Sequence, residues 1–251
     1  MEESDHRGVL HQRLASSINE KSSPLKDQPT EETLSYEVQP DYLRKTKRKK
    51  YRFLMLGFCC CFVLGNYFCY DYPAALELQI EEEFNVSSTT YGLLYTGYAV
   101  PNLFMPVLGG ILFDKVGTRS GLMLFTIILV IGQGLFTLGG YQMNFNLMFV
   151  ARIIFGIGCE AMYVGQSAIV SEWFINYELP FAMSMENCVP LVGSFAGGAI
   201  VPTVYLNSGF GASFGVGFLW CLFGLVMMII MWIVDRQTEK ADAEWLEEYT
   251  A

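Results

Sequence analysis

The stretch VARIIFGIGCEAMYVGQSAIVSEWF, Val150–Phe174, is apolar over a length that can cross a membrane, yet it carries Arg152 near its start and Glu160 at its middle. About twenty apolar residues span the hydrocarbon core of a bilayer as a helix. A charged side chain at the centre of such a helix costs about 2.5 to 3.5 kcal/mol on insertion scales, and it normally faces a partner or a water-filled cavity. The stretch therefore predicts a transmembrane helix in which both charges are candidates for function.

Five other apolar segments of similar length accompany this one. The six segments run over residues 53–72, 91–113, 121–140, 147–174, 181–206 and 212–234. The connections between them are short, so consecutive helices should pack antiparallel. Small residues allow helices in a membrane to approach closely, and Gly193 and Gly197 have the spacing that favours such a contact. The sequence predicts an all-α membrane protein with a six-transmembrane-helix bundle over residues 51–235.

The two flanks of this bundle differ from it in composition. Residues 1–50 are polar and poor in aromatic side chains, which predicts a disordered cytosolic tail. This tail ends in a basic juxtamembrane cluster, Arg44–Arg52, with seven Lys and Arg residues. The cluster could bind nucleic acid, but its position directly before the first span favours the anionic cytoplasmic leaflet, and we expect no nucleic-acid partner. Residues 236–251 form a predicted cytosolic C-terminal segment.

Lys and Arg are distributed unevenly between the two sides of the predicted bundle. One side receives the cluster Arg44–Arg52, then Lys115 and Arg119, then Arg236 and Lys240. The first connection on the other side contains no Lys or Arg and several glutamates between residues 77 and 83. Because positive residues stay in the cytoplasm, we expect both termini to be cytosolic and the segment 77–88 to be luminal.

The sequence offers little for catalysis or for a cofactor. Its two histidines, His6 and His11, both lie in the tail, and its seven cysteines lie in or beside apolar segments without the paired spacing of a metal site. We interpret these cysteines as small apolar side chains. No nucleophile with a neighbouring base is apparent in the spans. We therefore expect a protein that is not an enzyme and that binds no metal and no cofactor.

Several polar side chains within the spans are candidates for binding a solute. Tyr67, Tyr95 and Tyr98 place hydroxyl groups on the first two spans, where they could line a cavity or meet lipid headgroups. Glu160 could attract a cation or carry a proton. For Arg152 we favour a structural role, bonding backbone carbonyls or the first helix, over direct contact with a substrate.

The connection between the second and third spans has the sequence GILFDKVGTR and the spacing G-x-L-x-D-x-x-G-x-R. Its motif residues are Gly110, Asp114, Gly117 and Arg119. At this place in the chain the motif resembles the signature loop of the major facilitator superfamily. That resemblance implies the N-terminal half of a transporter with a 3+3 inverted repeat. It also implies a gate in which Asp114 bonds Arg119 and a helix N-terminus when the cytoplasmic side is shut.

Three further tracts make the resemblance more specific over most of residues 53–235. They are GNYFCYDYPAALELQI at 65–80, LLYTGYAVPN at 93–102 and RIIFGIGCE at 152–160. These tracts are similar to the lysosomal dipeptide uniporter family of the superfamily. The resemblance implies facilitated export of dipeptides through the lysosomal membrane by alternating access, with a glycosylated single-span accessory protein as partner. Glu160 matches the family acid that receives the dipeptide ammonium group, whereas the family basic residue on the fifth helix is Leu191 here.

Two other functions remain open from the sequence. The first is transport of another small organic solute, with proton coupling through Glu160 or Glu186. The second is a half-transporter that acts as a membrane scaffold without transporting anything. Transporters of this superfamily have two six-helix halves, so the resemblance implies a C-terminal half or a second copy as a further partner.

Overall fold

The computed structural model describes residues 49–175 and 178–250, and this part of the chain is almost entirely helical and contains no strand. The all-α prediction is thereby confirmed for the described residues. Most of the predicted tail, with Arg44 and its neighbours to residue 48, lies outside them. The helical bundle is the compact unit Lys50–Ile233, and the end of α9 from Val234 onward belongs to a second unit.

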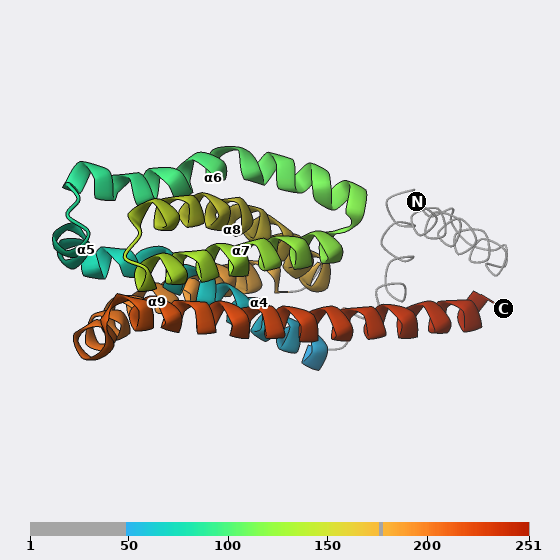
Figure 1. Ribbon diagram of the computed structural model, residues 1–251. Helices are drawn as coiled ribbons and strands as arrows, with labels where there is room; N and C mark the ends of the chain where they lie inside the picture. Colours follow the sequence, from blue (N-terminus) through green and yellow to red (C-terminus); the bar gives the residue numbers. More distant parts are fainter. Residues whose placement is uncertain (1–48, 176–177, 251) are drawn as a thin grey trace, which may run out of the picture. The chain divides into compact units, whose positions relative to one another are not determined.

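Figure 1 shows the helices of the bundle lying side by side. The elements in chain order are α4 (Lys49–Asp71), η1 (Tyr72–Leu76), α5 (Glu77–Glu83), α6 (Ser88–Val116), α7 (Thr118–Tyr141), α8 (Phe145–Phe174) and α9 (Leu179–Thr250). Five helical stretches are long and apolar enough to cross a membrane, by length and composition, in the described part of the chain. The last of these, in α9, contains both the fifth and the sixth predicted spans.

One predicted connection is found as a tight turn, and another contains a helix. At residues 207–211 two helices of α9 meet across a kink at Gly209, whose φ of 76° and ψ of −175° are not helical. This combination of angles favours glycine, because glycine has no Cβ. The chain turns at this residue, as the orange part of α9 shows in Figure 1. The segment predicted as a loop at 77–88 contains a further helix, α5.

The helix α8 lies at the centre of one group of contacts, and α4 packs closely against α9. The helices α6 and α7 both pack against α8. On α9, Gly193 lies directly against the backbone of Leu64 in α4. A side chain at this glycine would collide with that backbone, so the close approach of α4 and α9 depends on its small size.

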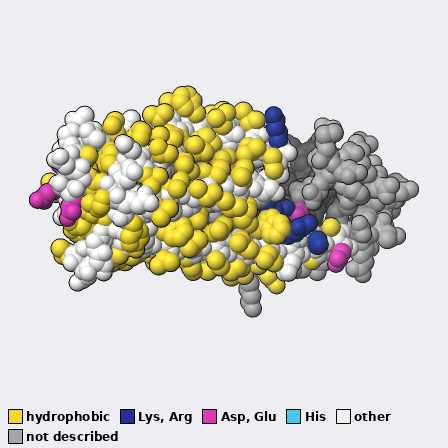
Figure 2. Space-filling model, viewed as in Figure 1, with side chains coloured by type: hydrophobic (Ala, Val, Ile, Leu, Met, Phe, Trp, Pro, Cys, Tyr) yellow, Lys and Arg dark blue, Asp and Glu magenta, His cyan; other side chains and the backbone are white. Residues whose placement is uncertain are grey.

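The outer surface of the bundle is apolar between two charged ends. In α6 only 22% of the apolar window is buried, and Leu103 is 74% exposed. Figure 2 shows hydrophobic side chains over most of the visible face, with acidic side chains at the α5 end and both basic and acidic ones toward the opposite end. Lipid chains can cover such an apolar surface, so the exposed side chains fit a membrane-spanning bundle.

Candidate functional site

The candidate site is built on one face of α8. Residues three and four apart lie on the same side of a helix, so Glu160, Tyr163 and Ser167 form a stripe along α8. The helix itself begins at a defined cap, where the Asn144 side chain accepts a hydrogen bond from the Leu147 backbone N–H at 3.1 Å. Glu160 lies at the middle of α8, where a membrane-spanning helix is furthest from water.

The Glu160 carboxyl group has few partners. Asn102 on α6 donates to Oε1 across a long 3.5 Å contact, and the Tyr98 hydroxyl lies close to the same carboxyl group. The side chain is half-buried, and within the described part of the chain it forms no ion pair. A carboxylate offers about four acceptor positions, so Glu160 retains capacity for a cation or a hydrogen-bond donor.

The predicted tyrosines occupy neighbouring but distinct positions. The Tyr98 hydroxyl lies 2.9 Å from Sγ of Cys159, the residue before Glu160, and the Tyr98 ring is 4.6 Å from that of Tyr70. Tyr95 accepts a hydrogen bond from Tyr91 at 3.3 Å. The structure thus brings Tyr98 to Glu160, whereas Tyr95 is joined to Tyr98 only through the ring of Tyr70, 6.4 Å from its own.

Tyr67 is the predicted tyrosine with the fewest contacts. Its side chain on α4 is half-buried, and its hydroxyl makes no hydrogen bond with the residues that the structure describes. The adjacent Asn66 does reach the site, because its Nδ2 donates to Sγ of Cys159 at 2.9 Å. The structure therefore places Tyr67 beside the candidate site without joining it to Glu160.

Arg152 lies in a closed environment of its own. Its Nη1 donates to the backbone carbonyl of Cys69 in α4 at 3.0 Å, and the residue is only 3% exposed. The guanidinium lies 4.5 Å from the ring centre of Phe136, 5.6 Å from that of Phe155 and 5.9 Å from that of Tyr72. Aromatic faces attract cations at these distances. This ring of contacts ties α8 to α4 and α7.

In the loop motif between α6 and α7, one residue adopts a backbone conformation that favours glycine. Gly117 caps α6 with φ 89°, a region that favours glycine, and its N–H donates to Phe113 O at 2.8 Å. Asp114 is exposed. Gly110 has open space around its Cα. The gate latch predicted for this motif stays a prediction.

Several polar contacts between α8 and α9 were not predicted as site residues. The Tyr163 hydroxyl donates to Oδ1 of Asn187 at 2.6 Å, and the Ser167 hydroxyl donates to Oε1 of Glu186 at 2.8 Å. Tyr163 and Ser167 lie three and seven residues after Glu160. This helical spacing could have identified the α8 side of these contacts from the sequence. Asn102 and Asn187 carry no comparable signal, because only the packing brings them to α8.

Leu191 follows Asn187 by one turn of α9 and is 62% exposed. It supplies no charge, and α9 has no Lys or Arg before Arg236. The part of α9 before Arg236 therefore offers no cationic side chain to a substrate carboxylate.

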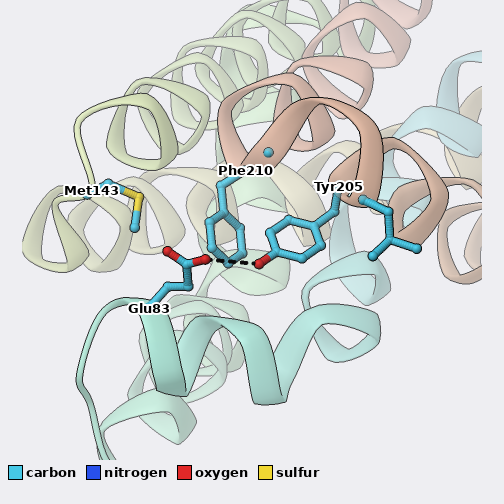
Figure 3. Close-up of a pocket in the computed structure, with 6 residues that line it drawn as sticks. Glu83, Met143, Tyr205 and Phe210 are labelled. Carbon is cyan, nitrogen blue, oxygen red and sulfur yellow. Dashed lines mark hydrogen bonds between the residues drawn. The ribbon is translucent and has the colours of Figure 1, made fainter.

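A separate pocket of about 480 Å³ lies where α5, the α7–α8 connection and the turn of α9 meet. Glu83, Met143, Tyr205 and Phe210 surround it, and Tyr205 donates to Oε1 of Glu83 at 3.2 Å, as Figure 3 shows. None of the predicted site residues lines this pocket. It is therefore distinct from the candidate site on α8.

A bundle of apolar helices with a charged residue at the centre of one helix defines the class of polytopic membrane proteins with an intramembrane polar site. The sequence model of the Major Facilitator Superfamily matches residues 43–248. The chain belongs to this superfamily, which confirms the resemblance inferred from the loop motif.

Similar proteins include the Lysosomal dipeptide transporter MFSD1 of Mus musculus, 33% identical over 77% of this chain and 44% of the relative. The protein of the same name from Danio rerio is 32% identical over 76% and 44%. The Probable sulfoacetate transporter SauU of Cupriavidus necator is 27% identical over 64% and 36%. The chain thus spans less than half the length of the curated relatives that it matches, and these relatives are named as transporters.

Solved structures support the same fold. The POT family transporter PepTSo has a TM-score of 0.61 at 13% identity, over 70% of this chain and 37% of that chain. An auto-inhibited POT family peptide transporter gives 0.59 at 14% identity over the same shares. This likeness in fold, together with the match to the superfamily model, confirms the predicted fold class, half of a major facilitator transporter.

Proposed function

We propose that this chain forms the substrate-binding half of an alternating-access transporter for small organic solutes that carry an ammonium group, with dipeptides as the leading candidates. The observation that carries the proposal is Glu160, a half-buried carboxylate at the middle of α8 with one long hydrogen bond. Transporter sites of this kind lie near the bilayer midplane. The names of the MFSD1 relatives support dipeptides as the solute.

Charge explains why an ammonium group fits this place. A carboxylate in low-dielectric surroundings forms stronger, charge-assisted hydrogen bonds to a cationic donor than to a neutral one. Tyr98 and Asn102 lie at the same carboxyl group and can orient it toward an incoming solute. Facilitated diffusion needs no further energy source, so the solute gradient alone drives export in this proposal.

The test compares two substrates and two variants of the chain in its native membrane assembly, reconstituted in liposomes. Glu160→Gln should reduce uptake of a labelled dipeptide by about 10- to 100-fold, because about 1.5 to 3 kcal/mol of charge-assisted bonding is lost. Glu77→Gln, at an exposed acid of α5, is the matched control and should transport normally. An N-acetylated dipeptide, which lacks the ammonium group, should be a poor substrate for all three proteins. Normal dipeptide uptake by correctly folded Glu160→Gln would refute the role of Glu160.

The absence of Lys and Arg from α9 before Arg236 favours a second candidate, a solute with an amine and no carboxylate. In this candidate the solute is an organic cation, and no basic partner on α9 is needed. Comparing a dipeptide with its C-terminal amide decides between the two. Better transport of the amide supports the cationic solute, whereas better transport of the free acid supports a dipeptide whose carboxylate is bound by a C-terminal half or a second copy. No transport of either compound would favour the non-transporting scaffold.

We also infer a lysosomal membrane location with both termini in the cytosol, from the names of the relatives and the placement of Lys and Arg. In sealed lysosomes, protease should remove an N-terminal tag without detergent. Protection of the tag until detergent is added would reverse the topology. Co-purification of a glycosylated single-span protein from the same lysosomes would support the proposed accessory partner.

The motif of Gly110, Asp114, Gly117 and Arg119 is proposed to stabilise the state that is closed to the cytosol. Asp114→Asn removes the charge that the latch needs and should shift the balance between inward-open and outward-open states without preventing insertion. The readout is the labelling rate of single cysteines introduced on each side of the bundle. Unchanged labelling on both sides would exclude the latch.

A further inference from the structure

The pocket at the α5 end of the bundle combines one carboxylate with two aromatic rings. The centres of the Tyr205 and Phe210 rings lie 4.6 Å apart, and the two rings are tilted by 48° to each other. Figure 3 shows the Glu83 carboxylate beside these rings, and Met143 adds a thioether to the lining. The pocket is therefore lined mainly by apolar and aromatic groups around a single carboxylate.

One wall of this pocket is fixed by the core of the bundle, and another lies at the surface. The Phe210 side chain is 5% exposed, because its ring packs against Phe84 at 5.4 Å and against Phe214 at 5.6 Å between ring centres. Leu206, in contrast, is 81% exposed, and Glu83 is also exposed. A ligand can therefore reach the aromatic rings from outside the bundle.

The Glu83 carboxylate has no cationic partner within the described residues. Tyr205 donates to Oε1 at 3.2 Å, and Oε2 accepts no hydrogen bond from this part of the chain. Between residues 53 and 233 the Lys and Arg residues are Lys115 and Arg119, in the loop motif after α6, and the enclosed Arg152. The short helix α5 contains four glutamates and no Lys or Arg. This end of the bundle should therefore have a negative potential that attracts cations.

The lining favours an organic cation over other ligands. Faces of Tyr and Phe attract ammonium groups, and quaternary ammonium ligands are recognised in this way. A metal ion would need several oxygen ligands, whereas the lining side chains supply oxygen atoms only from Glu83 and Tyr205. The volume of about 480 Å³ is large enough for a small organic molecule, because ligand pockets commonly measure about 300 to 1,000 Å³.

We propose that this pocket binds a small organic cation with an ammonium or quaternary ammonium group, at a site separate from Glu160. The cation lies against the rings of Tyr205 and Phe210, and Oε2 of Glu83 balances its charge. An occupied pocket connects α5 with the α7–α8 connection and with the turn of α9, which all contribute to its lining. Binding here involves no transport, so the site does not depend on the proposed function.

The test uses choline as the probe and dimethylbutanol, its analogue with carbon in place of the charged nitrogen, as the neutral control. Each protein is the full chain in lipid nanodiscs and carries Glu160→Gln, so that the ammonium site proposed on α8 does not contribute. Saturation-transfer NMR measures transfer from the protein to the methyl groups of the ligand, after subtraction of empty nanodiscs. The signal of choline should be at least about fivefold stronger than that of the neutral analogue, because only choline is attracted by the rings and the carboxylate.

The role of Glu83 is tested with a neighbouring acid as the control. Glu83→Gln should weaken choline binding by about tenfold, because a charged acceptor is replaced by a neutral one. Glu82→Gln removes the same charge from an exposed position outside the lining, and screening by salt should limit its effect to less than about twofold. An equal loss in the two variants would assign the effect to the general charge of α5 and overturn the site.

Two substitutions at Tyr205 separate the ring from its hydroxyl group, and they decide the outcome if Glu83→Gln does not fold. Tyr205→Leu removes one aromatic face and should weaken choline binding by about fivefold. Tyr205→Phe keeps that face and releases Oε1 of Glu83, so it should bind choline at least as tightly as the parent protein. Equal binding by the Leu and Phe variants would overturn the proposal, as would equal signals for choline and dimethylbutanol.

Discussion

Arg152 and Glu160 lie on the same helix, eight residues or about 12 Å apart, but they differ in burial and in the number of their contacts. Arg152 is 3% exposed, bonded to the Cys69 carbonyl and enclosed by aromatic rings from three helical segments. Glu160 is half-buried and accepts one hydrogen bond at 3.5 Å. A membrane imposes a similar cost on both charges, but the protein compensates the first more fully than the second, even though Nη2 of Arg152 has no hydrogen-bond partner in the described part of the chain. The second is left with room for a ligand.

This difference separates a structural charge from a candidate binding charge without reference to the identity of the substrate. It predicts that substitutions around Arg152 change mainly stability, whereas substitution of Glu160 changes mainly transport. Glu186 is an intermediate case, because it is as buried as Arg152 and has as few partners as Glu160. Substitutions at these positions and at their controls test the difference.

Arg152→Gln should have the largest effect on stability. It removes a charge-assisted hydrogen bond and a desolvated cation–π contact, for an expected loss of about 2 to 4 kcal/mol. The measurement is the melting temperature and folded yield of the purified protein in detergent. Lys115→Gln removes an exposed cation at the end of α6 and should leave both unchanged. A melting temperature for Arg152→Gln equal to that of the wild type would show that the aromatic enclosure contributes nothing.

Gly156→Ala should follow, with a loss of about 1 to 3 kcal/mol from overpacking. A Cβ at this position would lie 2.6 Å from the Tyr98 backbone carbonyl oxygen, and backbone atoms cannot move aside as a flexible side chain can. Gly92→Ala is the matched control, because nothing lies within 4 Å of the place that its new methyl group would occupy. Equal melting temperatures for the two variants would mean that α6 and α8 separate without cost.

Tyr72→Phe should cost about 1 kcal/mol, since it keeps the ring near Arg152 and removes one neutral hydrogen bond. That bond runs from Nε2 of Gln133 to the Tyr72 hydroxyl at 2.7 Å. The control is Tyr141→Phe at a side chain that is 65% exposed, and its unfolding curve should match that of the wild type. A loss as large as that of Arg152→Gln would assign the stability to the hydroxyl instead of the cation.

Glu160→Gln should have the smallest effect on stability, within about 0.5 kcal/mol, because no ion pair is broken and the amide can still accept from Asn102. Thermal unfolding in detergent checks this expectation on the same samples that are used for transport. A loss of stability comparable to that of Arg152→Gln would show that the two charges do not differ in their structural role. Glu160 would then be a structural residue.

The contacts of Arg152 and Glu160 also show which features of the site can be predicted from the sequence and which cannot. The charges themselves, the apolar length of α8 and the need of Gly117 for a special backbone conformation could be predicted, because each depends on residues close in the chain. The connection predicted at 207–211 is found as a turn at Gly209, where two helices meet across a kink. The partners Asn102 and Asn187 could not be found in this way, since they come from α6 and α9.

The sequence by itself determined the class of protein, an all-helical membrane bundle of the Major Facilitator Superfamily, because the length of apolar segments and a ten-residue loop motif are local properties. It also determined which side chains carry charge into the membrane. The tertiary structure alone decided which of those charges is compensated. Whether Arg152 meets a carbonyl and aromatic rings, or Glu186 a single hydroxyl, depends on contacts between helices up to 83 residues apart, and helix packing rather than local sequence sets those distances.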